Sequence, residues 1–329
     1  MRRLPLGRSQ AWVSELSFGA AGIGNLFTSV GDDDAELAVD TAWESGIRSF
    51  DTAPHYGLGL SERRLGVALR GRPREEYSVS TKVGRLLEPV AGPVGDDLAN
   101  RFAVPASHRR VWDFSADGVR RSLDASLTRL GLDRVDIVHL HDPGGHADQA
   151  LNEAYPALES LRAEGVVRAI GIGMNQSALP TRFVRETDID VVLLAGRYSL
   201  LDRSGLTDLL PEAQRHGTSV LVGGVFNSGL LAAPRAGACY DYAAAAPELL
   251  GRALHLQEIC TRHGVPLRAA AARFPFGHPA VTGVLIGLRS VEQVLDAVDQ
   301  LYRVIPDGLW EDLRTAGLLG DNTPVPEGS

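Results

Sequence analysis

The sequence has only two cysteines, Cys239 and Cys260. They are too few and too far apart for a disulfide framework or a CxxC metal site, and such usage is typical of a reducing compartment. An excess of basic charge is also absent, because the formal net charge is −8 and the pI is about 5.6. This balance disfavours a broad surface for nucleic acid or anionic lipid.

Long apolar runs are absent as well. No run of eighteen apolar residues occurs, so no membrane span is predicted. The start, MRRLPLGRSQAWVSELSFG, carries basic residues but no apolar stretch before a cleavage site, so it does not predict a signal peptide. We expect a cytoplasmic protein that acts on a small molecule and has no nucleic-acid or membrane partner.

What is present is an alternation of short apolar runs and longer amphipathic stretches, which is typical of βα units around a parallel sheet. Four amphipathic stretches, 33–45, 115–130, 149–164 and 248–263, end at a glycine. Every amphipathic stretch that we identify is assigned to one of the predicted barrel helices, and none is left over. The eight predicted strands are 16–19, 47–51, 77–82, 135–141, 167–172, 191–194, 219–222 and 283–286.

Eight such units predict an α/β fold of the (β/α)8 TIM-barrel class, and the 329 residues do not require a second domain. An open doubly wound sheet would carry GxGxxG after its first strand, and this fingerprint is missing. We predict one barrel domain over residues 1–320 and a disordered tail over 321–329. The long connections 83–114 and 223–247 follow strand ends, where barrel enzymes build their active sites.

Three consecutive predicted strands end in a polar or charged side chain. Asp51, Lys82 and His141 are these last residues, and Tyr56 follows Asp51 by five positions in a glycine-containing loop. Because the carboxyl ends of barrel strands open on one mouth, these four side chains are expected to converge. The simpler alternative is a structural ion pair, a core histidine and a loop aromatic, but the joint placement favours a catalytic site.

These residue types suit proton transfer on an oxygen while a cofactor moves a hydride on carbon. A phenol is a poor base at neutral pH, but the ammonium of Lys82 would favour its phenolate. Asp51 would pair with Lys82, and His141 would hydrogen-bond the substrate oxygen. We therefore predict hydride transfer between a nicotinamide cofactor and a carbonyl or hemiacetal carbon, with Tyr56 as general acid and base.

Four segments carry a resemblance to the aldo-keto reductase family: GIRSFDTAPHYGLGLSERRLG, SVSTKVG, GVRRSLDASLTRLGLDRVDIVHLHDP and IGLRSVEQV. The resemblance covers nearly the whole chain. It implies a (β/α)8 barrel with Asp51, Tyr56, Lys82 and His141 as catalytic tetrad. It also implies that NAD or NADP binds at the barrel mouth without a Rossmann fold.

Cofactor contacts follow from the same resemblance. Met174 replaces the usual serine, Ala195 a glutamine, Gln293 the arginine of many NADPH-specific members, and Ala297 an asparagine. An uncharged Gln293 favours NAD, although Arg289 could compensate. The implied cofactor-binding residues are Asn175, Phe226, Asn227, Ser228, Gly229, Leu230, Gly287, Leu288, Arg289 and Gln293.

The strings AGRYSLLDR, YGLGLSERRLG and HLHDP resemble the branch that contains L-fucose dehydrogenase, D-threo-aldose 1-dehydrogenase and pyridoxal 4-dehydrogenase. This implies oxidation of the cyclic hemiacetal of an aldose, of the L-fucose or D-threo type, to a lactone, with Tyr56 as base. Oxidation of pyridoxal, general aldehyde or ketone reduction, and a regulatory cofactor-binding barrel remain alternatives. The substrate-pocket candidates are His55, Phe102, Trp112, Arg197 and Tyr240.

A metal-dependent hydrolase is a further alternative. His139 and His141 lie on one strand face, and Asp142 or His146 could add a ligand. An HxH pair without matching ligands at other strand ends has low specificity, so we predict no metal site.

Overall fold

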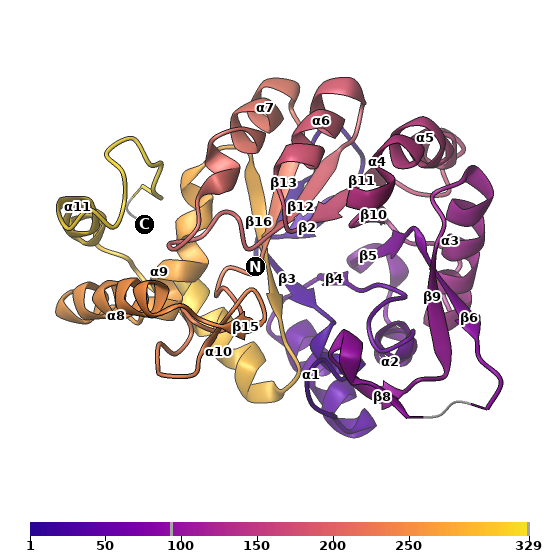
Figure 1. Cartoon of the computed structure of the whole chain (residues 1–329), viewed down its shortest axis with the longest axis horizontal. Helices are drawn as coiled ribbons and strands as arrows, with labels where there is room; N and C mark the ends of the chain where they lie inside the picture. The colour runs from indigo at the N-terminus through magenta and orange to yellow at the C-terminus, as the bar shows by residue number, and fades with distance from the viewer. Residues whose placement is uncertain (93–94, 328–329) are drawn as a thin grey trace.

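In the computed structural model, which describes residues 1–92 and 95–327, eight parallel strands close into a barrel (Figure 1). This confirms the predicted fold class. Each predicted strand occurs, and no end differs from the prediction by more than two residues. The barrel strands, in the order in which they pair, are β3 (Leu16–Gly19), β4 (Ser49–Asp51), β5 (Ser78–Val83), β10 (Ile137–His141), β11 (Ala169–Met174), β12 (Val191–Ala195), β13 (Ser219–Gly223) and β16 (Val281–Gly287).

Helices surround the barrel. The helix α3 shows why the sequence pattern works: Ser115 accepts a hydrogen bond from the Gly118 amide at its start, and Gly131 ends it in a left-handed conformation. The surrounding helices are α1 (Asp32–Glu44), α2 (Leu60–Leu69), α3 (Ala116–Leu130), α5 (Tyr155–Ala163), α6 (Ala178–Glu186), α7 (Leu209–His216), α9 (Leu267–Arg273) and α10 (Val291–Tyr302).

Two helices lie outside this ring. The helix α8 (Pro247–Arg262) was predicted as part of a repeating unit, but a further helix, α9, stands between it and the last strand. It packs against α11 (Asp307–Thr315), which the sequence analysis did not identify, and Figure 1 shows both helices to one side of the barrel. The stretch predicted as one helix over 149–164 divides into α4 (Ala147–Gln149), a π-helical turn (Ala150–Ala154) and α5.

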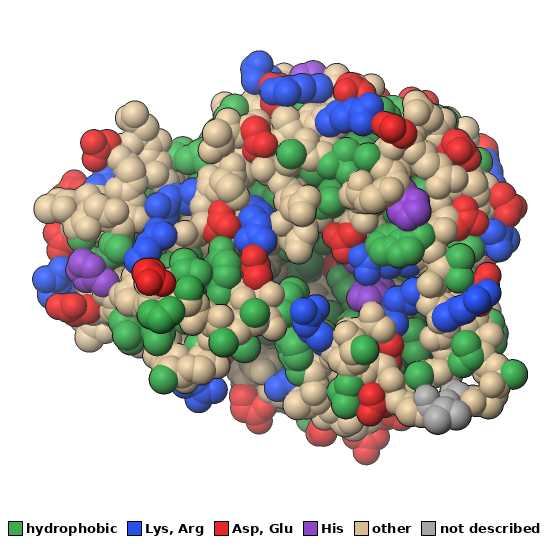
Figure 2. Space-filling view, viewed as in Figure 1, with side chains coloured by type: hydrophobic (Ala, Val, Ile, Leu, Met, Phe, Trp, Pro, Cys, Tyr) green, Lys and Arg blue, Asp and Glu red, His purple; other side chains and the backbone are tan. Residues whose placement is uncertain are grey.

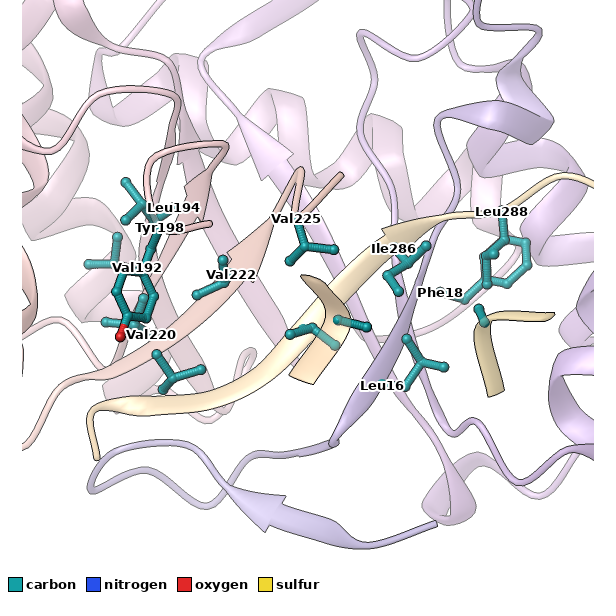
Figure 3. Close-up of a cluster of buried hydrophobic side chains, with 14 of the residues drawn as sticks. Leu16, Phe18, Val192, Leu194, Tyr198, Val220, Val222, Val225, Ile286 and Leu288 are labelled. Atoms are coloured by element: carbon teal, nitrogen blue, oxygen red, sulfur yellow. The ribbon is translucent and has the colours of Figure 1, made fainter. Parts of the chain in front are cut away.

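The core lies between the strands and the helices. Alternate strand side chains point outward into it, and Figure 3 shows such residues from several strands packed together. The labelled residues of this cluster that lie in strands are Leu16, Phe18, Val192, Leu194, Val220, Val222 and Ile286. Tyr198, Val225 and Leu288, also labelled, follow the ends of β12, β13 and β16.

A hairpin of β1 (Arg3–Pro5) and β2 (Trp12–Ser14) adds a second, smaller core. Its Leu6, Ala11 and Val13 pack against inward-facing side chains such as Leu193 and Leu221. The sequence analysis did not identify this hairpin. No described helix is long and apolar enough to cross a bilayer.

The long connections form short hairpins. Strand β6 (Arg85–Pro89) pairs with β9 (His108–Trp112), β7 (Asp96–Asp97) with β8 (Phe102–Pro105), and β14 (Cys239–Tyr240) with β15 (Ala243–Ala244). Residues 321–327 were expected to be disordered but pack on the protein: Thr323 is buried, its carbonyl accepts a hydrogen bond from Arg314, and Val325 contacts the core. The rest of the predicted tail, 328–329, lies outside the described residues.

Candidate active site

A buried ion pair lies at the mouth of the barrel. The ammonium Nζ of Lys82 in β5 donates to Asp51 Oδ2 at 2.6 Å and to the carbonyl of Thr52 at 2.9 Å. The other carboxylate oxygen accepts from the Ser80 hydroxyl at 2.7 Å. Both side chains of the pair are almost fully enclosed, and their polar atoms have partners, so their positions are fixed.

Tyr56 and His141 complete the group. The Lys82 Nζ lies 4.8 Å from the centre of the Tyr56 ring. The His141 ring lies 5.9 Å from that ring and nearly perpendicular to it. The structure thus brings together the four residues that the sequence analysis selected, from neighbouring strands β4, β5 and β10 and the loop after β4.

The protonation of Tyr56 differs from the expectation. Burial raises the pKa of the phenol, and the nearby Lys82 ammonium lowers it by less than burial raises it. For Lys82, burial opposes the charge, but Asp51 and Tyr56 together raise the pKa of the ammonium. When no further charged group lies beside them, the stable protonation states are therefore a neutral Tyr56 phenol and a charged Lys82 ammonium.

His141 is neutral as well. Burial, followed by the charges of Arg85 and Lys82, holds the pKa of its imidazole well below the usual value. A neutral imidazole can donate one hydrogen bond and accept another, so His141 is suited to orient an oxygen rather than to supply a positive charge.

Two cavities meet at Tyr56. The tetrad cavity, of about 520 Å³, is lined by Tyr56, Lys82 and His141. The side cavity, of about 340 Å³, is lined by Asn175, Phe226 and Gly287, among others. Figure 2 shows a hollow over the centre of the barrel with charged and histidine side chains beside it.

The chain was compared with known proteins. Residues 15–316 match the model of the Aldo/keto reductase family. The chain belongs to the aldo/keto reductase family. It is similar to D-threo-aldose 1-dehydrogenase from a Pseudomonas species, with 47% identity over 93% of this chain and 95% of the relative. It is also similar to pyridoxal 4-dehydrogenase from Microbacterium luteolum, with 42% identity over 95% of this chain and 97% of the relative.

Among solved structures, the chain resembles the holo form of an aldo-keto reductase from Bacillus halodurans. The TM-score is 0.77 at 29% identity, and the match covers 99% of this chain and 98% of the other. The protein is thus an oxidoreductase of a family that uses a nicotinamide cofactor, and its relatives match the branch that the sequence strings indicated.

The structure separates the residues implied as cofactor contacts into three groups. Asn175, Phe226, Asn227, Ser228, Gly229 and Gly287 line the side cavity. The side chains of Leu230 and Leu288 are buried in the core, so only their backbone could reach a ligand. The Asn227 amide is used internally, because it accepts from Ser199 and donates to the carbonyl of Gly196.

Arg289 and Gln293 lie apart from the side cavity, at the start of α10. Arg289 donates to the Thr28 hydroxyl at 2.5 Å. Arg289 and Thr28 line a groove of about 440 Å³ between α1 and α10, which we call the α1–α10 groove. Gln293 closes a helix cap: its amide oxygen accepts from the Arg289 N–H, while its own N–H donates to Ser290 Oγ. The S-x-x-Q spacing of residues 290–293 is the signal in the sequence that predicts this cap.

Of the five substrate-pocket candidates, His55 and Phe102 line the tetrad cavity. Trp112 stacks on His146 outside the cavity lining. Arg197 and Tyr240 instead bind Asp202, and Arg197 also pairs with Asp241.

Sequence reasoning missed other lining groups. Arg85 pairs with Asp142 on the cavity wall, and Tyr242 and Arg101 reach it from other loops. Asp142 had been considered only as a metal ligand. Within the described residues, no three His, Cys, Asp or Glu side chains lie close enough to share a metal ion.

Proposed function

We propose that this enzyme oxidises the anomeric carbon of an aldose of the L-fucose or D-threo type to a lactone, using NAD or NADP, with Tyr56 as the proton-transferring group. The observation that carries the proposal is the Asp51–Lys82–Tyr56 arrangement at the point where the two cavities meet. The identity with an enzyme named D-threo-aldose 1-dehydrogenase supports the substrate class.

The side cavity fits a nicotinamide cofactor. Phe226 offers an aromatic surface, and Asn175 offers an amide near Tyr56. Asn227, Ser228 and Gly229 all have positive φ and form a tight turn on the wall of the side cavity. The N–H groups of Asn227 and Gly229 donate to carbonyls within this turn, so among these three residues the Ser228 N–H is the one that would meet the pyrophosphate. Open space surrounds Gly287 where a side chain would project. When bound, the cofactor would supply an acceptor for the hydride from the anomeric carbon.

The residues of this chain would handle the oxygen. As the C1–H bond gives up its hydride, the hemiacetal O–H loses its proton and the lactone C=O bond forms. Tyr56 would receive that proton as phenolate and would donate it in the reverse direction as phenol. Lys82 would stabilise the phenolate, Asp51 would hold Lys82 in place, and neutral His141 would orient the substrate oxygen. Because burial raises the pKa of Tyr56, oxidation is expected to be faster at alkaline pH than at neutral pH.

The α1–α10 groove favours NAD over NADP in this proposal. Its lining includes Arg289 together with two carboxylates, Asp34 and Glu292. The 2′-phosphate of NADP would be attracted by the Arg289 guanidinium and repelled by the two carboxylates, whereas the uncharged 2′-hydroxyl of NAD would not be repelled.

The test is a turnover panel of L-fucose, other aldoses and pyridoxal with NAD+ and with NADP+, followed at 340 nm. Replacement of Tyr56→Phe should lower kcat by about 10²- to 10⁴-fold, which is the usual contribution of general acid–base catalysis, while cofactor binding persists. The matched control is Tyr155→Phe, at a half-buried tyrosine of α5 that lies outside the lining of both cavities and whose hydroxyl donates to Glu159 and accepts from the Asp188 N–H, and this variant should turn over normally.

Other outcomes would favour other functions. Turnover of pyridoxal alone would indicate the activity of the second relative, and turnover of simple aldehydes alone would indicate general reduction. Cofactor binding without turnover of any substrate would favour a regulatory barrel. Near-normal activity of Tyr56→Phe would contradict the role given to Tyr56.

A further inference from the structure

A series of polar contacts leads from the hairpin of β6 and β9 to the tetrad cavity. The proposed reaction does not account for these contacts. Arg110 of β9 binds the buried Asp97 carboxylate through two nitrogens, at 2.8 and 2.5 Å. The same guanidinium donates from Nε to His55 Nδ1 at 2.5 Å and from a terminal nitrogen to the His55 carbonyl at 3.0 Å. His55 is therefore held by both its ring and its backbone.

This contact fixes the tautomer of His55. Arginine stays protonated in proteins and has no acceptor, so His55 Nδ1 must be the unprotonated, accepting nitrogen. Burial, with the charges of Arg85 and Arg110, lowers the pKa of the imidazole to about 2, so the ring is neutral and its one proton is on Nε2. Nε2 has no hydrogen-bond partner among the described residues and is not an enclosed atom. An N–H donor therefore remains open for a ligand.

The ring lies beside the reacting groups. It precedes Tyr56 in the chain, and its centre is 5.7 Å from the His141 ring, nearly perpendicular to it. Phe102 contacts the ring edge-to-face at 5.3 Å, so the orientation of the imidazole is also fixed by packing. A substrate oxygen between Tyr56 and His141 would bring its neighbouring substituents close to His55.

Most charges of the cavity wall are paired. Lys82 binds Asp51, Arg85 binds Asp142 and Asp241 binds Arg197, whereas the exposed Arg101 lies over the Tyr242 ring and has no ion-pair partner among the described residues. Neutral hydrogen-bond donors such as the His55 N–H discriminate hydroxyl groups, because a buried donor without its partner is costly. Such a wall suits an uncharged, hydroxylated ligand.

We propose that His55 is a specificity-determining residue whose Nε2–H donates to a hydroxyl of the substrate next to the reacting carbon, and that Arg110 and Asp97 are positioning residues that act through it. The proposal rests on the proposed aldose oxidation and names the group that would select a polyhydroxylated substrate over a simple aldehyde.

The experiment tests each His55 variant against a set of substrates that each lack one hydroxyl group. His55→Gln places an amide N–H near the position of Nε2, whereas His55→Phe keeps the ring shape and removes the donor. L-fucose and its mono-deoxy analogues would be oxidised by each enzyme, and propanal would be reduced as a substrate without other hydroxyls. Cofactor affinity, from quenching of protein fluorescence, shows that each variant is folded and binds normally.

We expect His55→Phe to lower kcat/KM for L-fucose by about 5- to 20-fold, with most of the effect on KM, because a neutral hydrogen bond is lost. His55→Gln should recover much of this loss, and propanal reduction should change less than two-fold. One deoxy analogue should be a poorer substrate for the wild type but show no further loss with His55→Phe, since the two changes remove the same contact. Equal losses on every substrate, propanal included, would overturn the proposal.

A second readout follows the tautomer directly. Nitrogen NMR of labelled histidine should show His55 with a bare Nδ1 and a protonated Nε2 in the holoenzyme. Arg110→Met should remove this signature and raise the KM for L-fucose but not for propanal. If the wild type oxidises no sugar, the proposed function itself fails, and the His55 proposal fails with it. If the wild type oxidises sugars normally, but the losses in kcat/KM from His55→Phe and from removal of a substrate hydroxyl are additive for every deoxy analogue, only the role of His55 is contradicted.

Discussion

At the scale of single residues, the barrel encloses histidines that stay neutral, and this predicts a stability that depends on acid pH. Burial lowers the pKa of His139 to about 4 and, with Arg85 and Arg110 adding to the effect, that of His55 to about 2; the pKa of His141 is also well below its usual value. Below about pH 6.5 the unfolded chain takes up these protons and the folded chain does not. The free energy of unfolding should therefore fall as the pH drops from 6.5 to 4, by up to about 1.4 kcal/mol per pH unit for each histidine.

Urea unfolding at a series of pH values measures this slope, and His139→Met provides a matched test. Both ring nitrogens of His139 are buried without a partner, so the substitution breaks no hydrogen bond in the described structure. The variant should lose roughly one third of the slope that the three histidines produce, since each contributes through the same proton uptake. An unchanged slope would show that His139 takes up its proton in the folded state.

The residues of the tetrad could be predicted because parallel strands open on one mouth. Asp51, Lys82 and His141 each end a recognisable strand, so their convergence follows from topology alone. The contact between His55 and Arg110 could not be predicted, because it depends on how β6 and β9 pair within a long connection. The raised pKa of Tyr56 was also missed, since burial is a property of the folded chain.

At the scale of elements, the start of α10 has two roles, and a substitution can separate them. Gln293 caps the helix through Arg289 and Ser290. The family resemblance also implies that it takes the place of an arginine found in many NADPH-specific members. Gln293→Arg should lose the side-chain half of this cap, the hydrogen bond from the Arg289 N–H, while Ser290 still accepts from the backbone N–H of residue 293, so the expected cost is about 0.5 kcal/mol of stability. It should also lower the KM for NADP+ by roughly 10-fold, because a guanidinium pairs with a 2′-phosphate.

Gln293→Ala is the control for this prediction. It removes the same side-chain hydrogen bond without adding a charge, so its melting temperature should fall as much as that of Gln293→Arg while its cofactor preference stays that of the wild type. The two KM values for NAD+ and NADP+, measured for each enzyme, check the prediction. A shift toward NADP+ in the alanine variant would mean that cap geometry, rather than charge, sets the preference.

The elements that the sequence patterns predicted have both a regular spacing of apolar residues and a residue that signals where the element ends. Helix α3 has a serine cap and a terminal glycine, and its prediction was accurate to one residue. The helix α11 is an exception, because it is followed by Gly317 with a left-handed φ of 70°, so its stop signal was present and was overlooked in a helix of only nine residues. The hairpin of β1 and β2 has strands of three residues, which are too short for an alternation to be seen.

At the scale of the whole molecule, the barrel separates stability from chemistry. The tetrad lies at the carboxyl ends of the strands, whereas the hairpin core of Leu6 and Val13 packs on inward-facing side chains with Ile137 and Ala169, which begin their strands. Leu6 is fully buried although it lies near the end of the chain. Residues at the two ends of a barrel are expected to contribute to different properties.

Leu6→Ala should therefore destabilise the protein and leave the reaction unchanged. A buried leucine truncated to alanine usually costs about 2–5 kcal/mol, because it loses contacts and leaves a cavity. The matched control is Leu295→Ala on α10, where the leucine is 53% exposed and the expected change is within about 0.5 kcal/mol. The urea midpoint should fall for Leu6→Ala alone, while kcat and KM at 25 °C stay within two-fold for both variants. A large loss of kcat in folded Leu6→Ala would show that packing at the amino-terminal ends of the strands reaches the ion pair of Asp51 and Lys82, because no contact of Leu6 with the tetrad could explain it.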